Sequence, residues 1–404
     1  MNAKSVGKII ANLRKRQNMT QAELALRLNV SHKTISKWES GSGFPEVTQF
    51  PALAHIFNVS VDYLMAGGCG GIAVAGTIIT DIVKIIDTFP ERGMLSNIKT
   101  FSRSVGGCVP NTLIDLAKID NSLPLYAIGK IGDDEYGRYI TSQLQHYGID
   151  IKRVLLSDKL PTSFCDVMSV QSTGERTFFN MRGANAEFAP EDINLSELNC
   201  DILHMGYILM MDKFDCHDDK YGTVMARFFN KVQQCGIKTS IDVVSDSGKR
   251  FKETIVPVLK YCNYAFMNEI EACGISGLEP RNSDGSINID NIYKTMKMMI
   301  DYGVKDKVII HCPEAGFCMN ADGSFIKTAS LNIPSDSIKG TVGAGDAFCA
   351  GCLYSIYKGY SDEKMLDFAS RAAACCLFAS NSVDGIKSYD EIIKQTESFT
   401  RITI

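Results

Sequence analysis

The chain lacks the features that mark membrane and secreted proteins. Among its 404 residues, no apolar run approaches the roughly 20 residues needed to cross a bilayer. The first residues carry Lys4 and Lys8 among short apolar groups, without the single apolar block of a secretory signal. We therefore expect no signal peptide, no membrane association and a cytoplasmic location.

A disulfide framework is also missing. The 14 cysteines are scattered without paired spacing, which indicates reduced thiols in a protein that we expect to be cytoplasmic. Cys349 and Cys352 form a C-x-x-C pair, and Cys375 and Cys376 are adjacent. Both pairs lie in apolar helical stretches, so buried small residues are the simpler interpretation. No Cys/His spacing suggests a zinc site.

Charge is distributed unevenly, although the net charge is only -4. Residues 1–66 hold eight Lys and Arg against four Asp and Glu, whereas the remainder holds 34 against 42. A basic module on an acidic body indicates that only the N-terminal part meets a polyanion. Residues 67–71, Gly-Gly-Cys-Gly-Gly, are interpreted as a flexible linker that spans about 12 Å on average.

Residues 1–66 have the periodicity of short helices. Thr20 is followed three residues later by Glu23, which predicts a capping box, and Ser31 is positioned to cap the next helix. Two helices joined across residues 29–30 form a helix-turn-helix. Outward side chains of the second helix can hydrogen-bond to base edges or phosphates: His32, Lys33, Thr34, Ser36 and Lys37.

The segments 19–25 (MTQAELA), 30–31 (VS) and 35–41 (ISKWESG) resemble the Xre/Cro family of DNA-binding domains. By this resemblance, Gln21 would touch a phosphate and residues 32–37 would enter the major groove of double-stranded DNA. We expect the basic cluster at residues 14–16 to add phosphate contacts. The alternative is a helical bundle that mediates only protein contacts.

From residue 72 onward, short apolar segments alternate with amphipathic helices. Strands are expected at 72–74, 125–128, 202–205, 240–244, 264–267 and 308–311, with helices between them such as 134–146 and 223–235. This alternation predicts an α/β fold, with a parallel sheet and helices on both faces. Residues 84–103 and 162–180 predict a small antiparallel β lid or dimer contact. We expect three parts: 1–66, 67–71 and 72–404.

The strongest chemical signal is the glycine-rich segment 340–348, GTVGAGDAF. Its glycines let backbone amides converge on one point, and the helix that follows directs its positive end there. Such a turn stabilises charge on a transferring phosphoryl group. Asp346, at the start of this helix, can accept a proton from an attacking hydroxyl. Phosphoryl transfer needs little beyond a base, an anion clamp and Mg²⁺.

Further motifs accompany this loop along the chain. They are Gly76 with Asp81, the segment 104–111 (SVGGCVPN), the segment 129–137 (GKIGDDEYG) and the segment 268–271 (NEIE). With them, the chain from about residue 71 to its C-terminus resembles the PfkB/ribokinase family of carbohydrate kinases. The resemblance implies a ribokinase-like fold, ATP as co-substrate, Mg²⁺ as cofactor and phosphorylation of a sugar hydroxyl.

The resemblance also implies roles for single residues. Asp346 matches the catalytic base, and Gly343, Ala344 and Gly345 match the anion hole. Asn268 and Glu271 match the motif that organises Mg²⁺ and the phosphates, with Glu271 acting on the metal indirectly or through water. Sugar-binding positions are matched by Asp81, Gly106, Gly107 and Asn111, and nucleotide-binding positions by Gly316 and Thr341.

Three departures from the family pattern matter. The family usually has Asp where Gly340 stands, which puts activation by a monovalent cation such as potassium in doubt. His311 stands where Thr or Ser is common beside the triphosphate. The usual Asn and Arg after the strand ending at Val244 are absent, and the nearest candidates are Asp242, Ser245 and Arg250.

Three functions stay open at this point. The leading one is an active sugar kinase that also binds DNA, as a homodimer. The second is a sugar-sensing transcriptional regulator whose kinase fold is inactive, which Gly340 and His311 favour slightly. The third is a nucleoside kinase. Asp81 and Asn111 suit a polyhydroxylated ring, which both sugars and nucleosides contain.

Overall fold

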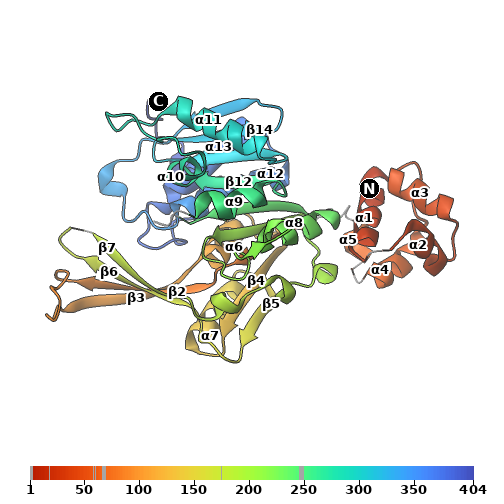
Figure 1. The fold of residues 1–404 in the computed structure, drawn as a ribbon, viewed down its shortest axis with the longest axis horizontal. Helices are drawn as coiled ribbons and strands as arrows, with labels where there is room; N and C mark the ends of the chain where they lie inside the picture. Colours follow the sequence, from red (N-terminus) through yellow and green to blue (C-terminus); the bar gives the residue numbers. More distant parts are fainter. Residues whose placement is uncertain are drawn as a thin grey trace.

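The structure is a computed structural model that describes residues 3–17, 19–57, 59, 61–65, 70–173, 175–244 and 250–404. It has a small helical N-terminal domain beside a larger α/β body (Figure 1). Of the predicted linker at 67–71, only Gly70 and Gly71 lie within the described residues. In the part of the chain that is described, no helix combines the length and apolarity that a membrane crossing requires.

The N-terminal domain consists of short helices around a compact apolar core. The helices are α1 (Ala3–Arg16), α2 (Gln21–Leu28), α3 (His32–Ser40), α4 (Phe50–Phe57) and α5 (Val61–Met65), with a 3-10 turn at Val47–Gln49. The capping box at Thr20 and Glu23 and the Ser31 cap are present as predicted. Ile35 and Trp38 of α3 are buried with Leu24 of α2. The predicted helix-turn-helix is therefore confirmed.

The body contains a nine-stranded sheet in the order β15-β14-β13-β12-β11-β8-β1-β4-β5. Its strands are β1 (Ile72–Gly76), β4 (Leu125–Gly132), β5 (Asp150–Ser157), β8 (Ile202–Ile208), β11 (Lys238–Val243), β12 (Tyr264–Asn268), β13 (Lys307–His311), β14 (Ala315–Asn320) and β15 (Phe325–Ala329). All six predicted strands are among them.

The sheet is parallel from β5 to β13, but β14 and β15 are antiparallel. The predicted parallel sheet is thus present, and two antiparallel strands that were not predicted extend it at one side. The connections at 312–314 and 321–324 are too short for a crossover, which requires a dozen or more residues, so these strands form hairpins.

Helices cover both faces of the sheet and bury two separate apolar cores. One face is covered by α8 (Val224–Gln234), α9 (Phe251–Leu259), α10 (Glu269–Ser276) and α11 (Ile289–Asp301). The other is covered by α6 (Cys108–Ile119), α7 (Glu135–His146), α12 (Ala344–Lys358), α13 (Asp362–Cys376) and α14 (Tyr389–Thr396). Alternate residues of β1 enter the two cores, as a fully buried central strand requires. The two-stranded ribbon β9 (His217–Asp218) and β10 (Gly222–Thr223) precedes α8.

A second sheet of four strands extends away from the body (Figure 1) and corresponds to the predicted lid. It has the order β3-β2-β6-β7, with β2 (Ile79–Ile86), β3 (Ile98–Gly106), β6 (Phe164–Val170) and β7 (Arg176–Met181). The prediction of an antiparallel lid is wrong in one pair, since β2 and β6 are parallel. Both strands follow parallel strands of the main sheet, β1 and β5, and therefore leave it in the same direction.

Candidate active site

The glycine-rich loop ends in the N-terminus of α12, as the sequence predicts. Gly343 caps this helix in the left-handed region, with φ of 83°. A Cβ at Gly343 would lie 2.5 Å from the Cβ of Ser382, so only glycine fits there. Asp346 lies in the first turn of the helix and is buried. The loop and the positive end of α12 thus surround this carboxylate.

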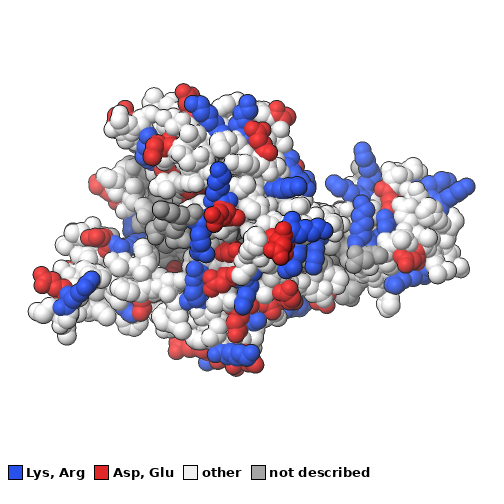
Figure 2. Space-filling view, in the orientation of Figure 1, with Lys and Arg blue, Asp and Glu red and all other residues white. Residues whose placement is uncertain are grey.

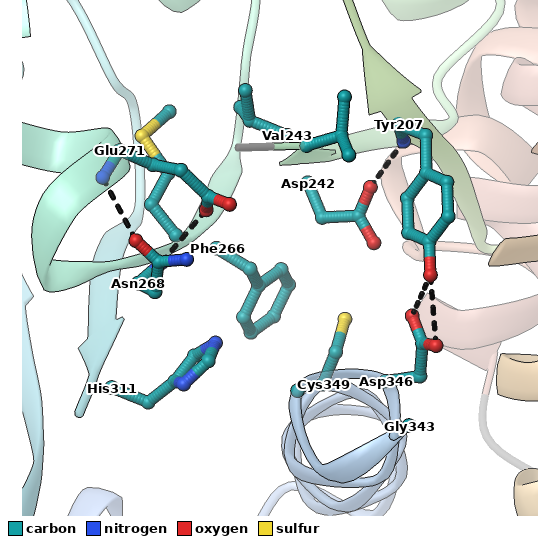
Figure 3. A pocket seen from close by; sticks show the side chains of 13 residues that line it. Tyr207, Asp242, Val243, Phe266, Asn268, Glu271, His311, Gly343, Asp346 and Cys349 are labelled. Carbon is teal, nitrogen blue, oxygen red and sulfur yellow. Dashed lines mark hydrogen bonds between the residues drawn. The ribbon is translucent and has the colours of Figure 1, made fainter. Parts of the chain in front are cut away.

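Two side chains from distant parts of the chain hydrogen-bond to Asp346. Asn111 donates from Nδ2 to Oδ2 of Asp346 at 2.8 Å. The Tyr207 hydroxyl donates to the same oxygen at 3.0 Å, as Figure 3 shows. Ser382 donates to Oδ1 of Asn111 at 2.8 Å and thereby orients the amide. Burial, together with the negative charge of Asp242, raises the pKa of Asp346 to about 7. The carboxylate is therefore poised to exchange a proton near neutral pH.

The residues predicted to bind sugar gather at the start of α6. A Cβ at Gly106 would lie 2.1 Å from Oδ2 of Asp81, so the carboxylate lies directly against this glycine. Gly107 precedes α6 with φ of 83°, and Asn111 lies in the first turn of the helix. Burial raises the pKa of Asp81 to about 7. Asp81 is also close enough for its charge to raise the pKa of Asp346.

The predicted metal-binding motif forms the start of α10. Asn268 Oδ1 accepts a hydrogen bond from the Glu271 amide at 2.8 Å, and Glu271 Oε2 accepts one from the Asn268 amide at 2.9 Å (Figure 3). His311 is paired with Asn268 across β12 and β13. Burial lowers the pKa of His311 to about 4, so its ring is neutral at physiological pH.

Three cavities meet around the loop at residues 340–346. A cavity of about 250 Å³ lies between β8, β11, β12 and α12 (Figure 3) and is lined by Tyr207, Asp242, Asn268, Glu271, His311 and Asp346. A second, of about 820 Å³, lies between the loop and the lid and is lined by Arg103, Arg176, Phe178, Gly340 and Thr341. A third, of about 610 Å³, is lined by Leu331, Thr341, Ala344, Phe348 and Ala374.

Gly316, predicted to lie at the nucleotide, lies behind a residue of the third cavity instead. A Cβ at Gly316 would lie 2.9 Å from the ring of Phe348, which is one of the residues that line the third cavity. Gly316 is not among the described residues that line it. Its absent side chain therefore makes room for Phe348.

Tyr207 is the main site residue that the sequence analysis missed. It lies near the carboxyl end of β8 with φ of 60°, and its amide donates to Oδ1 of Asp242 at 2.5 Å. Ligand sites of parallel α/β sheets lie at the carboxyl ends of strands, and this rule would have pointed to the end of β8.

Comparison with known proteins agrees with this geometry. The family model of pfkB carbohydrate kinases matches residues 71–388. The chain belongs to the pfkB family of carbohydrate kinases. A helix-turn-helix family model matches residues 10–64, so an N-terminal helix-turn-helix domain precedes the pfkB domain.

Relatives of this pfkB chain act on different substrates. It is 24% identical to the ribokinase of Arabidopsis thaliana over 327 residues, which cover 80% of each chain. It is 22% identical to the nucleoside kinase of Methanocaldococcus jannaschii over 338 residues, covering 82% of this chain and 99% of the relative. The structure of the ribokinase from Thermotoga maritima covers 81% of this chain and 99% of its own, with a TM-score of 0.67 and 20% identity. At this identity, the structural likeness shows the fold.

The helix-turn-helix domain of this pfkB chain exposes the side chains predicted to meet DNA. His32, Lys33, Ser36 and Lys37 are exposed on α3, and Thr34 is partly exposed. Figure 2 shows Lys and Arg side chains at the edge of the domain that carries α3.

Two other predicted DNA contacts are engaged within the domain. Gln21 donates to Glu39 at 2.7 Å. Arg14 is only 8% exposed, forms an ion pair with Glu39 at 2.5 Å and donates to the Met19 carbonyl at 2.6 Å. The expectation that the cluster at 14–16 contacts phosphates is therefore wrong for Arg14, because its guanidinium joins α1 to α3.

Proposed function

We propose that the chain is an ATP-dependent kinase that phosphorylates a hydroxyl of a sugar, and that its N-terminal domain binds DNA in a sequence-specific manner. The position of Asp346 carries the kinase proposal. It lies in the first turn of α12, directly after the glycine loop, and lines the cavity of about 250 Å³ together with Asn268 and Glu271. We also propose the division into domains at 1–66 and 72–404, joined by 67–71.

The proposed substrate site lies under the lid. Asp81 and Asn111 would hold hydroxyls of the sugar, with Gly106 and Gly107 allowing the ring to approach the backbone. Asp346, in its carboxylate form, would take the proton of the attacking sugar hydroxyl. The hydroxyl oxygen would then bond to the γ-phosphorus of ATP while the bond between that phosphorus and the oxygen of the ADP leaving group breaks. Amides of Gly343, Ala344 and Gly345 would stabilise the charge on the transferring group.

The proposed nucleotide site is the third cavity, whose volume is within the range of small-molecule sites. Thr341 and the start of α12 would face the phosphates. Asn268 and Glu271 offer the hard oxygen ligands that Mg²⁺ prefers, Glu271 through water. When bound, Mg²⁺ would neutralise phosphate charge. Since Gly340 supplies no carboxylate, we propose that potassium is not required for turnover.

A nucleoside kinase is the second candidate. The cavity of about 820 Å³ under the lid is large enough for a nucleoside, and two arginines, Arg103 and Arg176, line it. The side chains that suit the sugar ring would suit the ribose of a nucleoside equally well.

The DNA-binding proposal rests on the exposed polar face of α3 and on the net positive charge of residues 1–66. High affinity for an operator requires two such domains on half-sites about 34 Å apart, and we therefore propose a homodimer. Exposed aromatic side chains on the lid, Phe101 and Phe179, are candidates for the dimer contact.

A panel of sugars and nucleosides, assayed for ATP-dependent phosphorylation, tests the kinase proposal. The Asp346→Asn variant should retain sugar binding and lose about 10²- to 10⁴-fold in turnover, the usual contribution of a general base. Near-normal turnover would remove Asp346 from the base role. Sugar binding without phosphorylation by the unmodified chain would favour the inactive sensor.

A further inference from the structure

A cluster of three metal-ligating side chains lies beside the cavity of Asp346. It consists of His204 of β8, Asp242 of β11 and Cys349 of α12, whose ligand atoms all lie within 4.8 Å of one another. All three residues are buried, and His204 has no exposed surface. The proposed kinase mechanism uses neither His204 nor Cys349.

The distance between His204 and Asp242 is long for a hydrogen bond, and the contact with Cys349 is a long sulfur hydrogen bond. His204 Nε2 lies 3.4 Å from Asp242 Oδ2 and 3.8 Å from Cys349 Sγ. A charge-assisted N–H···O bond is normally about 2.7–2.9 Å long. A hydrogen-bonded pair of His204 and Asp242, with the Cys349 thiol packed beside it, therefore does not account for the length of the His204–Asp242 distance.

The same distances match the edges of a tetrahedral metal site. With zinc bonds of about 2.0–2.1 Å to nitrogen and oxygen and about 2.3 Å to sulfur, the N···O edge is about 3.4 Å and the N···S edge about 3.6 Å. Both values lie close to the observed distances of 3.4 and 3.8 Å. The third edge, between the Asp242 oxygen and Cys349 Sγ, is no longer than 4.8 Å, so side-chain rotation would close the three ligands around one ion.

Neighbouring groups orient two of the three side chains for this role. Nδ1 of His204 lies 2.8 Å from the hydroxyl of Ser240, which leaves Nε2 directed at the cluster. Such a partner on the second ring nitrogen is typical of metal-ligating histidines. Oδ1 of Asp242 accepts the amide of Tyr207, and Oδ2 is the oxygen that faces His204.

We propose that His204, Asp242 and Cys349 bind a single divalent transition metal ion, best matched by zinc. A mixed nitrogen, oxygen and sulfur set does not suit Mg²⁺, so this site is separate from the one proposed for Mg–ATP. Asp242 and Cys349 also line the cavity of about 250 Å³ (Figure 3), so the fourth coordination position opens toward Asp346. A bound ion would lie one helical turn from the proposed base, and we expect zinc to inhibit turnover.

Cobalt(II) is a suitable probe because its thiolate complexes absorb in the near ultraviolet. Full-length protein, freed of metal, is titrated with Co²⁺ in the presence of excess Mg²⁺. We expect one Co²⁺ per chain, a thiolate-to-metal absorption band and its loss when an equivalent of Zn²⁺ is added. Binding should release a proton from the thiol and weaken as the pH falls. Absence of the band would overturn the proposal, and this readout does not depend on kinase activity.

Variants locate the site. Cys349→Ser and His204→Gln should abolish the band, whereas Cys352→Ser should retain it, because Cys352 is buried in the same helix but lies outside the cluster. Ser240→Ala keeps all three ligands and should weaken affinity by about 10- to 100-fold. Thermal melting without metal checks the fold of each variant. If the ligand variants do not fold, the Co²⁺ affinity of Ser240→Ala is the deciding measurement. An unchanged band in folded Cys349→Ser, an unchanged Co²⁺ affinity in Ser240→Ala, or loss of the band in folded Cys352→Ser would contradict the site.

Discussion

Tyr207 contacts the proposed base through both of its carboxylate oxygens. Its hydroxyl donates to both carboxylate oxygens of Asp346, at 3.0 and 3.2 Å. A hydrogen bond to the ionised form favours that form, so this contact opposes the effect of burial on the pKa of Asp346.

The pH dependence of activity follows from this balance. Since a general base must be deprotonated, kcat/KM should fall tenfold per pH unit below the Asp346 pKa of about 7. In Tyr207→Phe the carboxylate loses one donor, its pKa rises, and the acid limb should move to higher pH. The measurement is kcat/KM against pH for both proteins. If the limb stays in place while only KM increases, Tyr207 is merely a substrate contact.

At the scale of secondary-structure elements, the start of α10 combines a helix cap with a proposed metal function. Glu271→Gln keeps a side-chain oxygen that can accept from the Asn268 amide, but removes the negative charge. We therefore expect a higher Mg²⁺ concentration for half-maximal activity at unchanged stability.

Glu391→Gln is the matched control, because Glu391 forms the corresponding capping box with Ser388 at the start of α14. The Glu391→Gln variant should reach half-maximal activity at the same Mg²⁺ concentration as the unmodified protein. A Glu271→Gln titration that overlays the unmodified one would argue against a role for this carboxylate at the metal.

The recognition helix α3 offers a second test at this scale. Lys33→Ala and Lys37→Ala should each weaken DNA binding and reduce the slope of log K against log salt by about one. Lys294→Ala, which removes an exposed lysine from α11, should leave this slope unchanged. Full-length protein that binds no genomic fragment at low salt would instead favour a domain that contacts only proteins.

Elements with strong local signals were predictable. The buried parallel strands are short apolar runs, and Thr20, Ser31 and Asn268 are helix caps whose chemistry acts within three residues. Strands β14 and β15 were missed because tight turns connect them to their neighbours, without the intervening helix that marks the parallel strands. The contact between Tyr207 and Asp346 joins residues 139 positions apart, and no local pattern encodes such a distance.

The cluster of His204, Asp242 and Cys349, which we propose as a metal site, was hidden for the same reason. The C-x-x-C spacing draws attention to Cys349 and Cys352 as a pair, whereas in the fold only Cys349 meets His204 and Asp242. His204 and Asp242 come from the neighbouring strands β8 and β11, and the packing of α12 on the sheet brings Cys349 to them.

At the scale of the whole molecule, a continuous path connects the end of the linker with the proposed base. The Gly70 amide donates to the carboxylate of Asp201 at 2.9 Å, and the Asp201 amide donates to the Gly71 carbonyl at 2.9 Å. Asp201 immediately precedes β8, and Tyr207 near the other end of that strand contacts Asp346. If substrate binds at Asp346 as we propose, it would contact a strand that is hydrogen-bonded to the end of the linker.

We accordingly expect sugar to change the affinity for operator DNA. Coupling of this kind is typically about 5- to 150-fold, and DNA must change sugar affinity by the same factor. Labelled operator is titrated with the Asp346→Asn protein, which prevents turnover, with and without saturating sugar. Superimposable curves would mean that the two domains are only tethered.

Trp38 gives the two-domain chain an intrinsic spectroscopic label. It is the only tryptophan among 404 residues, and its indole is 5% exposed in the core of the helix-turn-helix domain. Emission excited selectively at the indole therefore reports the melting of that domain alone, while the far-ultraviolet circular dichroism of the chain is dominated by the much larger kinase domain. Each domain can thus be followed through its own unfolding transition in one unmodified sample, without cutting the chain or attaching a dye.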